Sequence, residues 1–165
     1  MEIRSELPGD VDGIRAVTTA AFQSAEHSSG TESAIIDALR DAGALSISLV
    51  ALVDDELVGH VAVSPITVNG EDHGWAGLGP VSVLPDRQKQ GIGDALIRKG
   101  LETLKADGAR GCVVLGDPAY YRRFGFEHDA HLRLDGVPPE FFMQLTFEGE
   151  TPAGTVAYHL AFDTR

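Results

Sequence analysis

The segment VSVLPDRQKQGIGDALI, residues 81–97, decides the fold of this chain. Its β-branched start predicts a strand that ends at Pro85, and its apolar end predicts a helix, with Gly91 and Gly93 in the loop between them. Glycines let a ligand approach the main chain closely, and the first turn of a helix offers unpaired N–H donors and a positive dipole end. The segment therefore predicts a binding loop for an anion such as a pyrophosphate.

Two common nucleotide-binding loops do not fit this segment. No Gly-Lys-Ser/Thr sequence follows the glycines, which excludes a P-loop, and Leu96 stands where a dinucleotide fingerprint requires a third glycine or alanine. The Gln-x-x-Gly-x-Gly spacing alone is equally compatible with a loop that only turns the chain. Other features of the sequence must decide between binding loop and simple turn.

The pattern along the chain predicts an α+β architecture around one sheet. In chain order we expect a strand at 2–5, a helix after 8–10, a second helix ending at Gly43, strands at 47–53, 57–68 and 74–84, a helix at 91–107, a strand at 111–115, a short helix from Asp117-Pro118, and strands at 141–147 and 155–162. The length suits one domain, residues 1–165.

Charge and composition restrict the function classes. The net charge of -12 opposes binding to nucleic acid, because such binding requires Lys and Arg to neutralise phosphates. Residues 87–123, however, hold eight Lys and Arg against four Asp and Glu, so this segment suits an anion. The acidic remainder of the chain favours cationic amines over anionic ones as ligands. No apolar stretch is long enough to span a membrane, the start MEIRSELPGD lacks the features of a signal peptide, and Cys112 has no disulfide partner. We therefore expect a cytoplasmic location and no membrane partner.

Three motifs together resemble the conserved set of the GNAT acetyltransferases. They are Val83-x-Pro85, Gln88-x-x-Gly91-x-Gly93 and YYRRFGF at 120–126, and the GDPAxYxRFGF pattern at 116–126 is similar to that of a bacterial YhbS-like group of acetyltransferases. The resemblance covers nearly the whole chain. It implies a GNAT fold, with a mixed, mostly antiparallel sheet that is splayed at its central strands and flanked by about four helices, and it implies N-acetyl transfer from acetyl-CoA to a primary amine.

The resemblance also implies where acetyl-CoA binds. Main-chain atoms of Val81 and Val83 would pair with the pantetheine arm, and backbone amides of the loop would hold the pyrophosphate. Arg87 and Lys89 would either add charge near the phosphates or be solvated loop cations. The coenzyme residues expected on this basis are Val81, Ser82, Val83, Gln88, Lys89, Gln90, Gly91, Ile92, Gly93 and Asp94.

The resemblance assigns Tyr121 as the general acid that protonates the departing thiolate, with Tyr120 at a packing position. A phenol stays protonated at neutral pH and can donate to a developing sulfur anion. The segment 75–83 lacks the acid that serves as general base in one familiar GNAT pattern. Glu26 and His27, in the polar loop after the first helix, are candidates for acceptor binding and for proton removal.

The remaining residues exclude other kinds of catalysis. No spacing among His and Cys resembles a metal site, so no metal is expected. No Ser or Cys lies in a nucleophile elbow, which favours direct transfer in a ternary complex over an acyl-enzyme. The missing strand carboxylate leaves open a second reading, a non-catalytic module of the same fold that binds acyl-CoA or another protein. We expect a monomer or a homodimer.

Overall fold

A mixed β-sheet forms the centre of the computed structural model, which describes residues 1–23 and 30–164. Its strands are β1 (Glu2–Ser5), β2 (Ile47–Val53), β3 (Glu56–Val68), β4 (Trp75–Val83), β5 (Gly111–Leu115), β6 (Leu132–Arg133), β7 (Phe142–Thr146) and β8 (Gly154–Tyr158). The main path runs β1-β2-β3-β4-β5-β7, and β8 pairs with the far end of β3 and with β6. The β4–β5 and β6–β8 pairs are parallel and the others antiparallel, which confirms the mixed, mostly antiparallel sheet.

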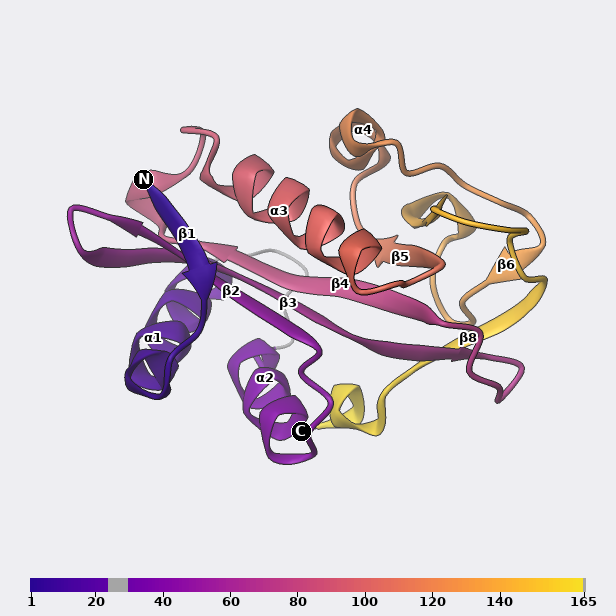
Figure 1. Ribbon diagram of the computed structural model, residues 1–165, viewed down its shortest axis with the longest axis horizontal. Helices are drawn as coiled ribbons and strands as arrows, with labels where there is room; N and C mark the ends of the chain where they lie inside the picture. Colours follow the sequence, from indigo (N-terminus) through magenta and orange to yellow (C-terminus); the bar gives the residue numbers. More distant parts are fainter. Residues whose placement is uncertain (24–29, 165) are drawn as a thin grey trace.

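Four α-helices of the described residues flank this sheet: α1 (Val11–Phe22), α2 (Glu32–Asp41), α3 (Ile92–Ala106) and α4 (Pro118–Tyr121). Figure 1 shows α3 and α4 on one side of the sheet and α1 and α2 on the other. The apolar spacing of α3 explains its position, because Leu96, Ile97 and Leu101 recur on one helix face and are buried against the sheet. Truncation of such a side chain, as in Leu96→Ala, would cost about 2–5 kcal/mol of stability.

The sheet opens between its two central strands. Only the first three residues of β4, Trp75–Gly77, pair with β5, where their partners are Gly111–Val113. β4 itself continues to Val83. At the point of separation Gly79 and Pro80 together oppose the single residue Ala62 of β3, which is a β-bulge. A bulge bends its strand, and proline has no N–H for the ladder, so β4 leaves β5 there. The splay expected from the sequence is thus present.

Two details differ from the sequence prediction. The strand expected at 155–162 ends at Tyr158, and a 3₁₀ helix, Leu160–Asp163, follows it. His159 begins that helix, because its Nδ1 accepts a hydrogen bond from the amide of Ala161 at 3.0 Å. The two-residue strand β6 was not expected, since a segment so short has no recognisable alternation.

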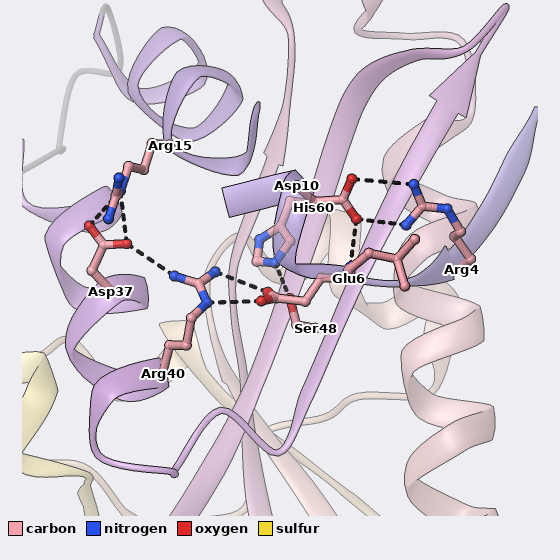
Figure 2. A network of polar contacts seen from close by, with 9 residues as sticks. Arg4, Glu6, Asp10, Arg15, Asp37, Arg40, Ser48 and His60 are labelled. Atoms are coloured by element: carbon pink, nitrogen blue, oxygen red, sulfur yellow. Dashed lines mark hydrogen bonds and ion pairs between the residues drawn. The ribbon is translucent and has the colours of Figure 1, made fainter. Parts of the chain in front are cut away.

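A network of polar side chains fixes α1 and α2 to the sheet (Figure 2). Asp37 of α2 binds Arg15 of α1 and Arg40, and the guanidinium of Arg40 also reaches both carboxylate oxygens of Glu6, at 2.8 and 2.9 Å. The Ser48 hydroxyl donates to the same carboxylate. The network therefore links the segment after β1 to both helices and to β2.

Candidate active site

An open cleft of about 650 Å³ lies where β4 has separated from β5. This loop cleft, as we name it, is bounded by the end of α1, by β4, by the β4–α3 loop with the first turn of α3, and by α4. Its volume is in the usual range for ligand sites. Its described lining residues are Ala21, Phe22, Val81, Val83, Arg87, Gln88, Lys89, Gly91, Ile92, Gly93, Asp94, Tyr120, Tyr121 and Arg123.

The β4–α3 loop presents backbone donors to this cleft. Gly91 is the N-cap of α3 and has a φ of 83°, a left-handed conformation that a side chain would disfavour. No side chain of the described residues caps the helix there. The amides of the first turn therefore have no partner within α3, and they face the cleft at the positive end of the helix dipole. This arrangement can bind an anion.

The exposed edge of β4 offers further main-chain groups. The amide of Leu84 donates to Val58 of β3 at 2.9 Å. Alternate residues of an antiparallel strand direct their main-chain groups to the same neighbour, so those of Val81 and Val83 point away from β3, toward the side that β5 has left. The side chain of Gln88 already donates to the carbonyl of Val83 at 3.2 Å. An extended ligand could pair with this edge as a strand would.

Tyr121 is held over the cleft by the local structure of α4. The Asp117 side chain caps the helix by accepting from the amide of Ala119 at 3.0 Å. A Cβ at position 116 would overlap the Tyr121 ring, so only glycine allows the ring to lie there. Burial raises the pKa of Tyr121 to about 12, which keeps its hydroxyl protonated across the neutral range.

Tyr120 has a role that the sequence did not reveal. Its hydroxyl donates to Oδ1 of Asp94 at 2.6 Å, and Arg123 binds the other carboxylate oxygen at 3.1 Å while its guanidinium lies 4.5 Å from the Tyr120 ring centre. The hydrogen bond from Tyr120, and then the one from Arg123, lower the pKa of Asp94 although burial opposes them. These three residues tie α4 to the first turn of α3.

A second cavity, of about 490 Å³, adjoins the loop cleft. The two share Phe22, Val81 and Tyr121, so they meet at the opening of the sheet. We name it the apolar cavity; its other described lining residues are Glu32, Ile35, Leu78, Gly79, Pro80, Leu115, Leu134, Tyr158 and Phe162. These residues come from distant parts of the chain, and no pattern in the sequence predicts that they meet.

Most of the coenzyme residues expected from the sequence lie together in the loop cleft. Two do not line it: Ser82 is buried with its hydroxyl 3.4 Å from that of Thr18 on α1, and Gln90 turns toward the carbonyl of Asp86 at 3.5 Å. Arg87 lines the cleft but is also paired with Glu56 at 3.2 Å. Glu26 and His27 lie outside the described residues.

Within residues 1–23 and 30–164, no group of three or more His, Cys, Asp or Glu side chains is arranged to hold a metal ion. The same residues include no helix with the length and apolar character needed to cross a bilayer.

The opened sheet and the loop at the start of α3 define a class of protein. A profile of the acetyltransferase (GNAT) domain matches residues 2–128. The chain belongs to the GNAT family and is an N-acetyltransferase, as its motifs predicted.

Particular relatives resemble the chain over nearly its full length. The protein named uncharacterized N-acetyltransferase YhbS from Escherichia coli K12 is 37% identical over 172 residues, covering 99% of each chain. A GNAT family acetyltransferase from Brucella melitensis, crystallised in complex with acetyl-CoA, is 51% identical with a TM-score of 0.89, covering 98% of this chain and 97% of its own. E. coli YhbS, crystallised in complex with CoA, has a TM-score of 0.90 at 36% identity, covering 98% and 91%. The GNAT fold is thereby confirmed.

Proposed function

We propose that this protein transfers an acetyl group from acetyl-CoA to a primary amine, directly and within a ternary complex. The observation that carries the proposal is the meeting of two cavities at Val81 and Tyr121. A thioester held in the loop cleft would there face an amine held in the apolar cavity. Proximity of this kind supplies much of the rate enhancement of a two-substrate reaction.

The residues of the loop cleft suit acetyl-CoA. The amides from Gln88 to Asp94 would hold the pyrophosphate, which needs donors and positive potential rather than a metal. The main-chain edge at Val81 and Val83 would pair with the amide groups of the pantetheine arm, with Ser82 serving only through its backbone. Acetyl-CoA and CoA in the crystal structures of the two relatives support this assignment.

Tyr121 would act as the general acid. As the amine nitrogen bonds to the thioester carbonyl carbon and the carbon–sulfur bond breaks, the Tyr121 hydroxyl gives its proton to sulfur. The proton that the nitrogen loses on becoming an amide then restores the Tyr121 hydroxyl. With a pKa raised by burial to about 12, the hydroxyl is protonated across the neutral range and is able to donate. The amine must first lose its own proton, and Glu26 and His27 are our candidates for the acceptor of that proton.

Release of free CoA thiol tests the proposal. The protein is incubated with acetyl-CoA and a panel of primary amines, and the thiol is titrated against controls without amine. Intersecting lines in initial-velocity plots are expected, since both substrates must be bound before transfer; parallel lines would indicate an acyl-enzyme. Acetyl-CoA binding without thiol release from any amine would contradict the proposal and favour a non-catalytic binding module.

A further inference from the structure

The walls of the apolar cavity limit the chemistry of what can enter it. Side chains of Phe22, Leu78, Leu115, Leu134 and Phe162 come together there from five separate segments of the chain. Glu32 supplies the one charged side chain among its described lining residues. Such walls favour a molecule whose body is apolar.

Desolvation disfavours acceptors with several charges. A polyamine placed in the apolar cavity would bring a second ammonium group against hydrocarbon walls, and a buried charge without a partner is expensive. An alkyl or aromatic body would instead remove apolar surface from water on both sides of the contact. The acidic charge of the chain attracts cations in general, and the cavity walls select among them.

One apolar side chain in the wall of this cavity also reaches solvent. Leu115 lines the cavity and is nevertheless 45% exposed. An apolar ligand that covers Leu115 would remove further apolar surface from water.

We propose that the acceptor is a monovalent primary amine with an apolar alkyl or aromatic body, bound in the apolar cavity with its nitrogen toward Val81 and Tyr121. This inference rests on the proposed function, because it identifies the apolar cavity with the acceptor site. Net charge alone favours cationic acceptors of any kind. The inference restricts them to amines with one charge and an apolar body.

A homologous series of amines tests the inference. Thiol release is measured for linear alkylamines from propylamine to hexylamine and for 1,6-diaminohexane, which matches hexylamine except for its second charge. We expect kcat/KM to rise about fourfold for each methylene added, as burial of a methylene predicts. The diamine should be at least tenfold poorer than hexylamine. A flat series, or a preference for the diamine, would overturn the inference while leaving acetyl transfer itself intact.

Paired substitutions locate the effect. Leu115→Gln should lower the preference for hexylamine over propylamine about fivefold, because it replaces part of the apolar wall. Leu7→Gln changes an exposed leucine that does not line the cavity, and it should leave the preference as it is. If the two substitutions change the preference for hexylamine equally, the amine does not bind in the apolar cavity.

A binding measurement separates this inference from the proposed function. Thermal stability is recorded with CoA present, with hexylamine or 1,6-diaminohexane added. If no amine is acetylated, stabilisation by hexylamine that exceeds stabilisation by the diamine, and that is lost in Leu115→Gln, would still support the inference. Absence of that difference would overturn it.

Discussion

The two adjacent tyrosines of α4 hold their hydroxyl groups in different surroundings. Tyr120 donates to Asp94, whereas Tyr121 has no hydrogen-bond partner among the described residues and lies where the two cavities meet. A hydroxyl engaged by a carboxylate cannot also give its proton to a thiolate. Of the pair, Tyr121 is therefore the one suited to donate to the leaving group.

Tyr121→Phe should lower kcat for acetyl transfer at least tenfold and leave the affinity for acetyl-CoA nearly unchanged. The hydroxyl acts only as negative charge collects on sulfur, so its loss weakens the transition state and spares the ground state. Phenylalanine keeps the ring contact with Phe126, whose centre lies 6.0 Å away. Steady-state rates and a separate titration of acetyl-CoA measure the two quantities. Turnover within about twofold of the wild type would show that Tyr121 is structural.

Tyr120→Phe should act differently, through stability and coenzyme binding. Loss of a hydrogen bond to the charged Asp94 costs about 1.5–3 kcal/mol, which in a chain of this length should lower the melting temperature by about 3–12 °C. It should also raise the KM for acetyl-CoA, since the first turn of α3 loses one of its links to α4. Thermal melting and initial rates test both effects. If Tyr120→Phe and Tyr121→Phe reduce kcat equally at unchanged KM, the distinction between the tyrosines is wrong.

At the scale of elements, the sequence predicts those helices and strands whose formation depends on the spacing of apolar residues nearby in the chain. The spacing in α3 and the alternation in β2 and β3 identify these elements because burial of one face imposes a period. The β4 bulge at Gly79 and Pro80 and the pairing of β8 with β3 depend on partners far away in the sequence. The same is true of the Asp94–Tyr120 bond and of the apolar cavity. The glycine loop before α3 was therefore predictable from the sequence, and the apolar cavity was not.

Gly91→Val should remove the stabilisation of the protein by CoA. Valine disfavours the left-handed conformation at the N-cap, and its side chain would block the approach of a pyrophosphate to the amides. In the wild type, CoA at 100 times its dissociation constant should add about 2.7 kcal/mol of stability. Differential scanning fluorimetry with and without CoA measures the change.

Gly108→Val is the matched control for this experiment. Gly108 follows the other end of α3, has a φ of 87°, and has open space around its Cβ position, as Gly91 does. Both variants should therefore lose similar intrinsic stability, but only Gly108→Val should keep the shift with CoA. An undiminished shift in Gly91→Val would remove this loop from the binding site.

Over the whole molecule, one buried histidine is linked to the polar network that fixes α1 and α2. His60 of β3 is fully buried, and its Nε2 lies 2.7 Å from the Ser48 hydroxyl (Figure 2). Since that hydroxyl donates to Glu6, Nε2 of His60 must carry the proton. Nδ1 is left without a partner among the described residues. A second proton on Nδ1 would therefore have no acceptor in this part of the chain, and burial outweighs the attraction of the Glu6 carboxylate for the charged ring.

Acid should therefore destabilise the fold well above the pH at which carboxylates titrate. Burial lowers the pKa of His60 to about 4, so between that pH and about 6.5 the unfolded chain binds a proton that the folded chain does not. The stability present above pH 6.5 is lost as the pH falls through this window, by about 3 kcal/mol in full. Despite burial, hydrogen bonds from Arg40 and Ser48 lower the pKa of Glu6, whose contribution is lost only at still lower pH.

His60→Gln should weaken the dependence of protein stability on pH. Glutamine can still donate to Ser48 but does not titrate, so the free energy of unfolding should change less between pH 7 and pH 5 than in the wild type. Urea unfolding at pH 7 and at pH 5 measures this change in the free energy of unfolding. A loss of stability that the substitution causes equally at both pH values cancels in the comparison. His73→Gln, in an exposed turn, is the control and should keep the wild-type slope. The assignment to His60 fails if the two variants share one slope, because the proton uptake that destabilises the protein would then occur at other residues.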